Sequence, residues 1–548
     1  MEKKYVIGLD FGTKSGRALL VDAKTGEAAG QAVKDYAHGV MDRSLPDGTP
    51  LGTGWALQHP QDYLDVLEYT IREALTVSRV HKEDVIGLSL DFTASTILPI
   101  DVERQPLCFS KRFEKRPHAY VKLWKHHAAV SQTETINRVL TERGLIDLPL
   151  FGGKVSAELL LPKTMQILEE DPEVYREAAA ILEAADWLTL LLTGSRGRSF
   201  STAAYKAMWD GKQYPPPDLL RAFHPGLEHL AQEKLSVDIV PMGSRLGELN
   251  EAWAGRLGLL PGTAVGTSII DAHAGLPGCG IVKPGQMMLI IGTSSVLAAL
   301  GKNPYSGRGV MGGVKDGIIP GYYALESGQA GVGDIFEWFM INAVPAAYRD
   351  RAAAEGKNLF AYLAGLLQDK GPGQNGLLAL DWWNGNKTPF VDAGLSGLVA
   401  GYTMTTRPED VYRALVEATG FGARTIMETF EEAGVAIGEI RACGGIAGKD
   451  PFVMQLYADI TGREIKVLPG QTAALGAAMY AAAAAGTGRG GHHSIASAAA
   501  AMSRPGERSF RPRPENVKTY SVLYRYYQEL CAFLGSSGIL HGLKTLGT

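Results

Sequence analysis

The sequence predicts an α/β protein built as two lobes, and three observations lead to that fold class. The apolar run at residues 5–9 ends in Asp10-Phe11-Gly12-Thr13, which is typical of a strand leading into a phosphate-binding turn. A second apolar run, at residues 287–291, ends in Gly292-Thr293-Ser294. The chain has 548 residues, too many for one compact core. Two lobes around one nucleotide are therefore expected.

Glycine and a hydroxyl residue suit such turns for a physical reason. Glycine has no side chain to keep backbone N–H groups away from phosphate oxygens, and the hydroxyl adds a donor. We therefore assign nucleotide contact to Gly12 and Thr13 in the first turn and to Gly292, Thr293 and Ser294 in the second.

Asp10 closes the first strand, where a carboxylate would repel a phosphate group directly. Its natural partner is a magnesium ion, reached through metal-bound waters. A single Asp-x-Gly would more often be an ordinary turn, but the second copy of the pattern favours the phosphate interpretation.

The composition is that of an ordinary soluble globular protein, with 45% hydrophobic residues, 20% charged residues and a formal net charge of −4. This balance is not basic enough for general nucleic-acid binding. The chain begins without the apolar segment of a secretion signal, so export is not expected. Residues 473–485 are mostly alanine and too short to span a bilayer, so they predict a packed helix, followed by a loop at residues 486–491.

Cysteine and histidine give no sign of a metal or disulfide framework. The four cysteines form no Cys-x-x-Cys pair, which favours a reducing cytoplasm. In the pairs His126-His127 and His492-His493 the side chains point apart, so we interpret them as surface residues.

The elements of the first lobe follow in order. Residues 55–78 predict a helix, with Pro60 near its start and apolar residues on one face. Residues 85–90 predict a short strand that ends at Asp91-Phe92-Thr93-Ala94-Ser95, and loops at this end of a strand hold ligands in α/β proteins. Helices are expected from about residue 122 to residue 192, one of them beginning at Asp171-Pro172.

A further strand is expected at residues 263–270, ending in Asp271. The glycine-rich segment 278–285 follows and is the expected domain boundary. The N-terminal lobe would then comprise residues 1–283 and the C-terminal lobe residues 284–548.

In the second lobe, Thr406 and Glu409 predict a capping box at the start of a helix that runs to Gly434. A short strand at residues 440–443 leads into Gly444-Gly445, a plausible seat for the base and sugar of a nucleotide. Residues 500–548 carry tyrosines and leucines at helical spacing, which predicts a helix on the second lobe or on a neighbouring subunit.

Other nucleotide-binding patterns do not fit. Between Gly444 and Gly448-Lys449 stand three residues, where a P-loop has four. The dinucleotide fingerprint is missing from the first strand turn, and the protein-kinase signature set is absent. What remains is the two-lobed arrangement of actin, the heat-shock chaperone ATPase and sugar kinases.

Eight motifs narrow this choice further. They are GLDFGT at residues 8–13, DFTAST at 91–96, AYKAMW at 204–209, DAHAG at 271–275, GTS at 292–294, ESGQ at 326–329, DWWNGN at 381–386 and GGIA at 444–447. With them the chain resembles the FGGY carbohydrate kinase family from Tyr5 to about Gly486, and within it the bacterial members that phosphorylate L-ribulose. The resemblance implies two actin-like, ribonuclease H-like lobes with an ATP and sugar cleft between them.

The resemblance also implies site residues. Asp271 would be the general base that accepts the proton of the sugar hydroxyl, and it could in addition cap a helix beginning at Ala272. Sugar contact carries over to Lys206, Asp271 and Glu326, and backbone contact to Ala94. Taken alone, Lys206 would more often be a solvated lysine.

The sequence leaves the roles of two residue pairs undecided, one of tryptophans and one of glycines. Trp382-Trp383 could form a platform on which a sugar ring stacks, or could belong to the core. By resemblance Gly444 and Gly445 would lie against the adenosine, the alternative being a plain strand-to-helix turn.

The implied activity is ATP-dependent phosphorylation of a small ketopentose, L-ribulose giving L-ribulose 5-phosphate, in arabinose breakdown, with ATP and Mg²⁺ as cofactors. Another FGGY kinase acting on xylulose, ribitol or glycerol is the first alternative. A chaperone-like or filament-forming ATPase is the alternative of another class, and Lys206, Asp271 and Glu326 argue against it. No nucleic-acid or membrane partner is expected, the location is cytoplasmic, and a homo-oligomer is left open.

Overall fold

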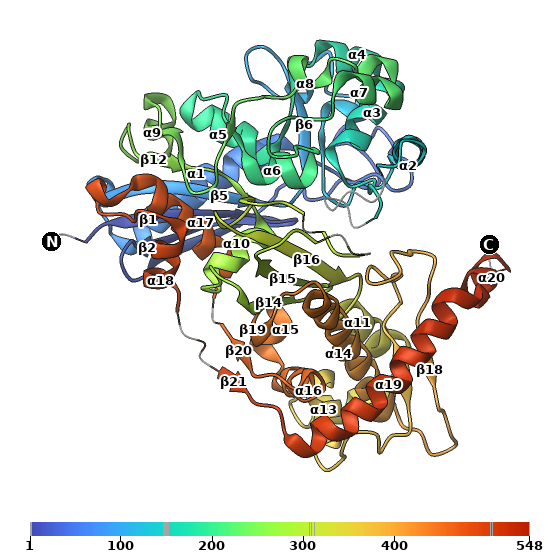
Figure 1. The fold of residues 1–548 in the computed structure, drawn as a ribbon. Coiled ribbons are helices and arrows are strands. Elements are labelled where there is room, and N and C mark those ends of the chain that lie inside the picture. Colours follow the sequence, from blue (N-terminus) through green and yellow to red (C-terminus); the bar gives the residue numbers. More distant parts are fainter. Residues whose placement is uncertain are drawn as a thin grey trace. The chain divides into compact units, whose positions relative to one another are not determined.

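The computed structural model describes residues 3–145, 153–305, 307, 309–311, 313–468, 470–504, 506 and 508–546 (Figure 1). The chain forms two compact units. Unit 1 comprises Met1–Val282, Gly312–Ala324 and Gln471–Arg504, and unit 2 comprises Lys283–Met311, Leu325–Gly470 and Pro505–Thr548. The expected division of the functional lobes at residue 283 stays a prediction, and residues 471–504 pack with unit 1.

Unit 1 is built on a sheet whose strands follow the order β11-β12-β5-β1-β2-β3, with β13 beside β5. Strands β5, β12 and β13 run parallel to one another and to β1, whereas β2 forms an antiparallel hairpin with β1. The strands are β1 Tyr5–Phe11, β2 Ser15–Asp22, β3 Ala28–Asp35, β5 Val85–Phe92, β11 Arg245–Glu248, β12 Ala264–Gly266 and β13 Ile269–Ile270. The carboxyl ends of β1, β5 and β13 therefore lie at one edge.

The strand expected at residues 263–270 is interrupted at Thr267 and Ser268, which separate β12 from β13. The carbonyl groups of these two residues accept side-chain donors instead of ladder bonds. Ser89 Oγ donates to Thr267 O at 3.0 Å, and Ser199 Oγ donates to Ser268 O at 2.6 Å.

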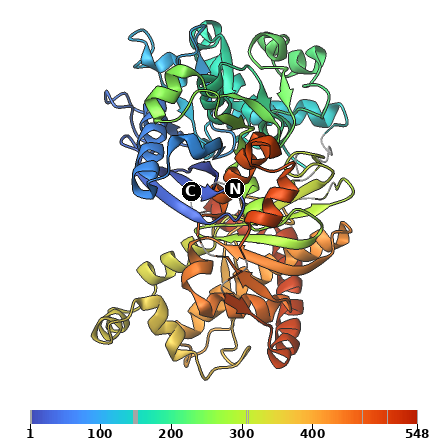
Figure 2. The same cartoon turned by 90° about the vertical axis from the view of Figure 1, so that its left-hand side faces the viewer.

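Two helices cover the sheet from opposite faces. Helix α1, Pro60–Ser78, packs its apolar face on β2 and β3, and the expected helix therefore begins at Pro60, with β4 Leu57–Gln58 before it. Helix α17, Thr472–Ala485, covers β1 and β5 on the other face, with α18 Ile495–Met502 beside it (Figure 2). The alanine-rich segment is thus the packed helix that the sequence predicts.

A second sheet of unit 1, ordered β4-β7-β6-β8, lies among helices of the same unit. Its strands and those of the small β9–β10 pair are β6 Ile97–Ile100, β7 Val121–Lys122, β8 Ala180–Glu183, β9 Arg198–Ser199 and β10 Ile239–Val240. The helices are α2 Val130–Glu142, α3 Leu160–Glu170, α4 Pro172–Glu177, α5 Ala184–Thr193, α6 Phe200–Lys206, α7 Pro217–Phe223, α8 Leu230–Glu233, α9 Glu251–Leu257 and α10 Asp271–Gly278.

Helices are expected from about residue 122 to residue 192, and within this range the described residues are helical at 130–142, 160–170, 172–177 and 184–192. Residues 123–129, 143–145 and 153–159 are not helical, β8 lies between α4 and α5, and residues 146–152 lie outside the described residues. A helix begins at Asp171-Pro172 as expected, and Asp171 caps α4, because its Oδ1 accepts the N–H of Val174 at 3.2 Å.

Unit 2 repeats the hairpin-plus-parallel-strand pattern of unit 1. Its sheet has the order β16-β15-β14-β19-β20-β21, in which β14 pairs antiparallel with β15 and parallel with β19. The strands are β14 Gly285–Ile291, β15 Ser295–Gly301, β16 Tyr323–Gln329, β19 Ile437–Cys443, β20 Ile465–Val467 and β21 Arg508–Phe510, with a separate pair β17 Leu378–Leu380 and β18 Leu398–Ala400.

The helices of unit 2 are α11 Gly333–Asn342, α12 Ala346–Ala354, α13 Leu359–Leu366, α14 Pro408–Glu432, α15 Gly445–Lys449, α16 Pro451–Thr461, α19 Pro514–Ser537 and α20 Ile539–Leu546. The capping box expected at Thr406 and Glu409 is wrong by one residue. Asp410 Oδ2 accepts the N–H of Arg407 at 3.0 Å, and Pro408 occupies the first helical position, where its missing N–H costs nothing.

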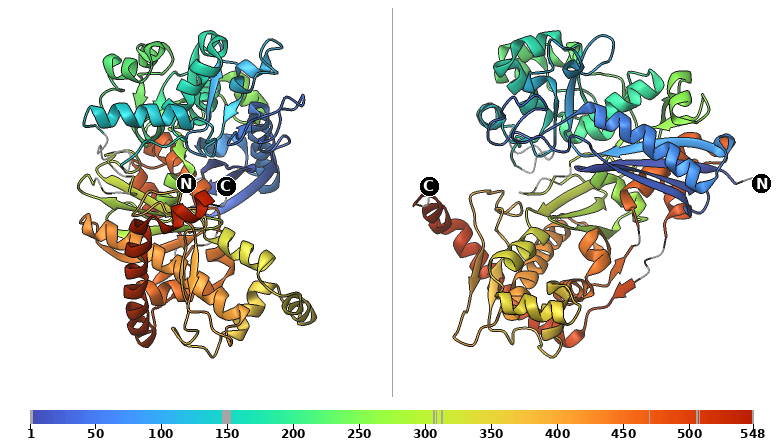
Figure 3. Two further views of the ribbon diagram at one scale, coloured as in Figure 1. Left: turned by 90° about the vertical axis from the view of Figure 1, so that its right-hand side faces the viewer. Right: turned by 180° about the vertical axis from the view of Figure 1, so that it is seen from behind.

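The C-terminal helix α19 packs on unit 2, along α16 and α14 (Figure 3). Its buried side chains Tyr520, Tyr524, Tyr527 and Leu534 belong to the core of that unit. No helix within the described residues is long and apolar enough to cross a membrane.

Candidate active site

Three carboxylates gather at the carboxyl edge of the unit 1 sheet. Asp10 on β1 and Asp91 on β5 are paired residues of adjacent parallel strands. Ile269 on β13 is paired with Asp91, so Asp271 follows just beyond the end of that strand. The first two acids are largely buried, and each side chain lies in the field of the other.

Asp91 has an unusual environment. It is fully buried, and neither of its carboxylate oxygens has a hydrogen-bond donor among the described residues. Burial raises the pKa of Asp91 well above its usual range, and the negative charges of Asp10 and Asp271 raise it further. Burial also raises the pKa of Asp10, against the opposing effect of Arg17, whose Nε lies 3.4 Å from Asp10 Oδ2.

From the sequence, Asp91 is predicted only as part of the loop where a strand ends. The sequence feature that marks Asp91 is an acid near the end of the otherwise apolar strand β5, VIGLSLDF. Asp10 has the corresponding position in β1, YVIGLDF. Only the pairing of the two strands shows that these acids are neighbours.

The first predicted phosphate turn is held by side chains from elsewhere in unit 1. Gly12 N–H bonds Ser15 O at 3.0 Å and closes the turn. The Trp124 indole N–H donates to Thr13 Oγ1 at 3.0 Å, and Gln58 Nε2 donates to Thr13 O at 2.8 Å. Because Thr13 Oγ1 accepts from Trp124, its own proton is directed elsewhere, as a phosphate donor requires. Neither Trp124 nor Gln58 could be predicted from the sequence as a residue of this turn.

Asp271 is the first residue of α10, and the helix therefore begins one residue earlier than expected. Its Oδ1 accepts the N–H of Ala272 at 2.6 Å, which orients the carboxylate. Helix α6, which ends in Lys206, packs beside α10, where the rings of Tyr205 and His273 lie 4.3 Å apart.

Asp186 on α5 fixes α6 relative to the strand that leads to Asp271. It accepts hydrogen bonds from Ser199 N–H, Thr202 Oγ1 and Ser268 Oγ, and it forms a buried ion pair with Arg198 at 3.0 Å. One buried carboxylate thus joins the start of α6 to the segment between β12 and β13.

Lys206 itself is only 8% exposed, and its ammonium group makes no hydrogen bond or ion pair within the part of the chain that the structure describes. A largely buried lysine whose ammonium has no protein partner can bind a polar ligand. Ala94 lies in the loop after β5, between Thr93, whose N–H bonds Phe11 O at 3.2 Å, and Ser95, which has a φ of +50°.

In unit 2 the structure brings the second phosphate turn and the Gly444-Gly445 turn together. Gly444 has a φ of +97°, and a Cβ there would lie 2.6 Å from Ile291 O, next to Gly292. Thr293 O accepts the N–H of Val332 at 2.8 Å and that of Asp334 at 3.2 Å, so the start of α11 holds the turn. Ser294 O accepts Gly292 N–H at 2.9 Å.

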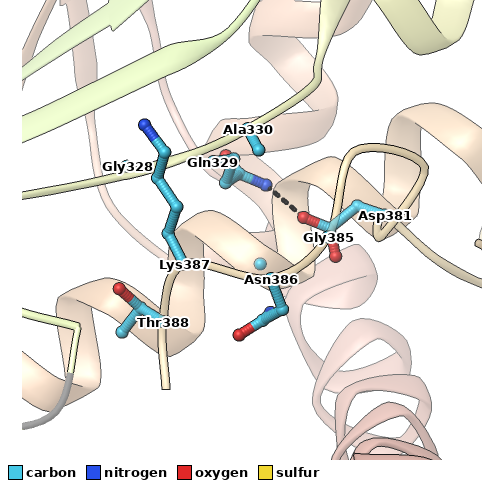
Figure 4. Close-up of a pocket in the computed structure, with 9 residues that line it drawn as sticks. Gly328, Gln329, Ala330, Asp381, Gly385, Asn386, Lys387 and Thr388 are labelled. Atoms are coloured by element: carbon cyan, nitrogen blue, oxygen red, sulfur yellow. Dashed lines mark hydrogen bonds between the residues drawn. The ribbon is translucent and has the colours of Figure 1, made fainter. Parts of the chain in front are cut away.

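Glu326 lies on β16 in unit 2, where its backbone pairs with Met311. Further along this strand, Gln329 lies in a polar pocket lined by Gly328, Gln329, Ala330, Asp381, Gly385, Asn386, Lys387, Thr388 and Gly422 (Figure 4). Gln329 Nε2 points to Asp381 and donates to its Oδ2 at 2.7 Å. Gln329 Oε1 accepts from Ser295 Oγ at 2.8 Å, next to the second phosphate turn.

Trp382 belongs to the core, because it is 1% exposed and packs edge-on against Phe390. Its role as a sugar platform is thereby excluded. Trp383 is half-buried and packs against Trp338 with ring centres 5.7 Å apart.

The surface position expected for His126 is wrong, although His127 is exposed as expected. His126 is fully buried, accepts the N–H of Ala56 at 3.3 Å and contacts Gln166 Oε1 at 2.9 Å. The pairing of β4 with β7 places residue 126 under Trp55, which spacing along the chain could not show.

Comparison with known proteins agrees with this architecture. Models of the FGGY family of carbohydrate kinases match the chain at residues 5–278, with the N-terminal domain, and at residues 287–485, with the C-terminal domain. The chain belongs to the FGGY family of carbohydrate kinases. The predicted fold class, an α/β protein of two actin-like lobes, is confirmed.

Individual relatives are similar over almost the whole chain. Identity is 47% over 538 residues to the ribulokinase of Geobacillus thermodenitrificans, covering 98% of this chain and 95% of that one. It is 48% over 539 residues to the ribulokinase of Bacillus licheniformis, covering 97% of each. The crystal structure of xylulose kinase from Rhodospirillum rubrum superposes with a TM-score of 0.79 at 22% identity, covering 98% of this chain and 100% of that one, and shows the fold alone.

Proposed function

We propose that this chain transfers the terminal phosphoryl group of ATP to the terminal hydroxyl of L-ribulose, giving L-ribulose 5-phosphate in arabinose breakdown. Support comes from the ribulokinases that it resembles at 47–48% identity over nearly their full length. The structural observation that carries the proposal is Lys206, which is 8% exposed and whose ammonium has no protein partner among the described residues, on a helix packed beside the helix that Asp271 begins. A polyol fits such a pair, because hydroxyl groups both accept and donate hydrogen bonds.

Asp271 is the proposed general base. Phosphoryl transfer passes through a loose transition state, so the protein contributes mainly alignment and neutralisation of charge. The sugar hydroxyl becomes acidic as its bond to phosphorus forms, and a carboxylate then suffices to accept the proton. The bond from Ala272 N–H holds that carboxylate in one orientation.

Sugar contact is assigned to Lys206, Asp271 and Glu326, and to the backbone of Ala94. Nucleotide contact is assigned to two turns of unit 2 and one turn of unit 1. The residues are Gly12, Thr13, Gly292, Thr293, Ser294, Gly444 and Gly445. Each of these glycines leaves backbone N–H groups accessible to phosphate or ribose oxygens.

The acids at the sheet edge fit a magnesium ion. The described residues contain no cluster of three or more His, Cys, Asp or Glu side chains that could enclose a metal, but magnesium needs only one or two carboxylates, with waters and phosphates completing its shell. Asp10 would hold it through water, with the donor-free oxygens of Asp91 beside it. When bound, the ion neutralises phosphate charge.

We place the reaction in the cytoplasm, where the thiols of Cys108, Cys279, Cys443 and Cys531 would stay reduced. A homo-oligomer stays a prediction. Xylulose, ribitol or glycerol is the alternative acceptor, because a binding site distinguishes related polyols through only a few side-chain contacts. A chaperone-like or filament-forming ATPase is the alternative from another class.

The test is an ADP-release assay with L-ribulose, D-xylulose, ribitol and glycerol, each run with and without Mg²⁺. We expect L-ribulose to give the highest kcat/KM and ADP release without sugar to stay at background. A higher kcat/KM for another polyol would make that polyol the assigned acceptor in place of L-ribulose. ADP release that does not depend on sugar would overturn the kinase assignment.

A further inference from the structure

Lys163 on α3 is fully buried and bonds two separate backbone segments. Its Nζ donates to Ser95 O at 2.6 Å and to Leu123 O at 2.8 Å. Ser95 lies in the loop after β5, and Leu123 follows β7. One ammonium group therefore fixes the distance between two segments that are 28 residues apart in the sequence.

Both segments lead to the proposed site. Ser95 follows Ala94, and its φ of +50° is a left-handed conformation that a non-glycine residue keeps only when its surroundings impose it. Leu123 precedes Trp124, whose indole N–H donates to Thr13 Oγ1 at 3.0 Å. Through these bonds Lys163 connects the proposed sugar loop to the first phosphate turn.

The charge of Lys163 is costly where it lies. Burial lowers the pKa of Lys163 to about 7; Glu183 and Glu158 favour its ammonium form, and Lys206 opposes it. An apolar side chain of similar length would fill the same space without this cost. The bonds to Ser95 O and Leu123 O are what such a side chain could not supply.

We propose that Lys163 is a positioning residue, which holds the Ala94–Ser95 loop and the Trp124 segment in fixed register so that the acceptor hydroxyl and the transferring phosphoryl group are aligned. This inference rests on the proposed function, because it concerns the same sugar site. Lys163 touches neither substrate in this scheme, and it acts through the two carbonyl groups that it binds.

The chain offers a matched control in Lys122, a second fully buried lysine of unit 1. Its Nζ donates to Gln166 Oε1 at 3.0 Å and lies 4.2 Å from the centre of the Trp55 ring, but its hydrogen bonds reach neither Ser95 nor Leu123. Lys163→Met and Lys122→Met remove the same amino group from similarly buried positions, so the comparison separates the loss of the two carbonyl bonds from the loss of a buried lysine.

We expect Lys163→Met to lower kcat/KM for the ketopentose at least about 30-fold, with a raised sugar KM and more ATP hydrolysed per sugar phosphorylated. Lys122→Met should change kcat/KM less than about threefold at the same loss of Tm. Trp124→Phe should lower kcat/KM as well, and the double variant Lys163→Met/Trp124→Phe should lose less than the product of the single losses. Equal kinetic losses in the two lysine variants would overturn the proposal.

A second measurement separates this inference from the proposed function. Hydrogen–deuterium exchange should be at least about tenfold faster in Lys163→Met than in Lys122→Met at the amides of residues 93–96 and 124–125, which leave out the strand partner and the chain neighbour of Lys122. This readout needs no sugar. If no ketopentose is phosphorylated by the wild type, the proposed function fails, whereas unchanged exchange at these amides overturns the positioning role.

Discussion

Asp10 and Asp91 are paired residues on two adjacent parallel strands, and neither carboxylate oxygen of Asp91 has a donor among the described residues. Asp271 adds a third acid to the same sheet edge. Such a group of acids would repel a phosphate-bearing ligand unless a cation stood between them. The arrangement therefore suits magnesium-dependent chemistry and disfavours direct phosphate contact by these side chains.

Asp10→Asn should raise the Mg²⁺ concentration for half-maximal activity at least about tenfold, because the remaining amide is a weaker ligand for a hard cation or its waters. The measurement is a Mg²⁺ titration of ADP release at saturating ATP and sugar. Asp35→Asn, at an exposed position near the end of β3, is the control. An unchanged Mg²⁺ requirement in Asp10→Asn would remove this residue from the metal site.

Asp271→Asn should reduce turnover at least about 100-fold and leave the ATP Kd within about threefold, because it removes a base without removing a nucleotide contact. Single-turnover kinetics and equilibrium binding of ATP measure the two effects. Asp218→Asn, an exposed acid on α7, controls for the loss of one charge. Retention of more than about a tenth of the rate would contradict the assignment of the base.

Gly476→Ala should destabilise unit 1 although alanine is favoured over glycine within a helix by about 1 kcal/mol. A Cβ at residue 476 would lie 1.9 Å from Ala274 O, so α17 and α10 would have to separate. We expect the free energy of unfolding to fall by roughly 2 kcal/mol or more.

Gly488→Ala is the matched control for this prediction, because nothing lies within 4 Å of its Cβ position. Chemical denaturation of both variants measures the difference. A Gly476→Ala variant as stable as Gly488→Ala would mean that the two helices are less closely packed than described.

Tyr527→Phe should lower the free energy of unfolding by about 1–2 kcal/mol, because Tyr527 donates to Asp381 Oδ1 at 2.9 Å and Asp381 is buried. Burial already raises the pKa of Asp381, and losing this donor would raise it further. Tyr526→Phe, at a position 48% exposed, should change stability by less than about 0.5 kcal/mol. Equal effects of the two variants in thermal denaturation would show that the buried bond contributes nothing.

Glu183→Gln should change how stability depends on pH. Burial raises the pKa of Glu183 from 4.5 to about 7, against the attraction of Arg198. The folded protein therefore binds a proton here that the unfolded chain releases. The resulting stability is fully present below pH 4.5 and is lost as pH rises through about 7.

Because glutamine does not titrate, the Tm of Glu183→Gln relative to wild type should rise between pH 5 and pH 8. The corresponding free energy is at most about 3 kcal/mol, at about 1.4 kcal/mol per pKa unit. Thermal denaturation across this range measures it, with the exposed Glu103→Gln as control. A difference from wild type that stays constant with pH would contradict the buried, proton-binding state.

Much of the fold could be predicted because its signals are local. The two strand-to-turn patterns at Asp10 and Gly292 became β1 and β14, each followed by a hairpin strand. The helix start predicted at Asp171-Pro172 depends on residues close together in the sequence, and it was also confirmed. The cap predicted at Thr406 was wrong by one residue, because Pro408 occupies the first helical position and Arg407 precedes it as the cap.

Long-range pairing explains what could not be predicted. Asp91, Trp124 and Lys163 each contact residues that are distant in the sequence, and residue types alone give such contacts no signal. His126 was misjudged for the same reason, because the strand pairing that buries it joins residues 57–58 to residues 121–122.

The sequence by itself determined the two strand-to-turn hairpins, the α/β class and the positions of Asp10 and Asp271 at strand ends, because each depends on side-chain chemistry and backbone freedom within a few residues. Only the tertiary structure decided that α17, near the end of the chain, packs on the first sheet and that Lys163 bonds two loops of the proposed site. Such contacts form because they bury apolar surface, and many segments of the chain could bury a similar amount. Which segments pack together depends on complementary surface shapes, and these exist only in the folded chain.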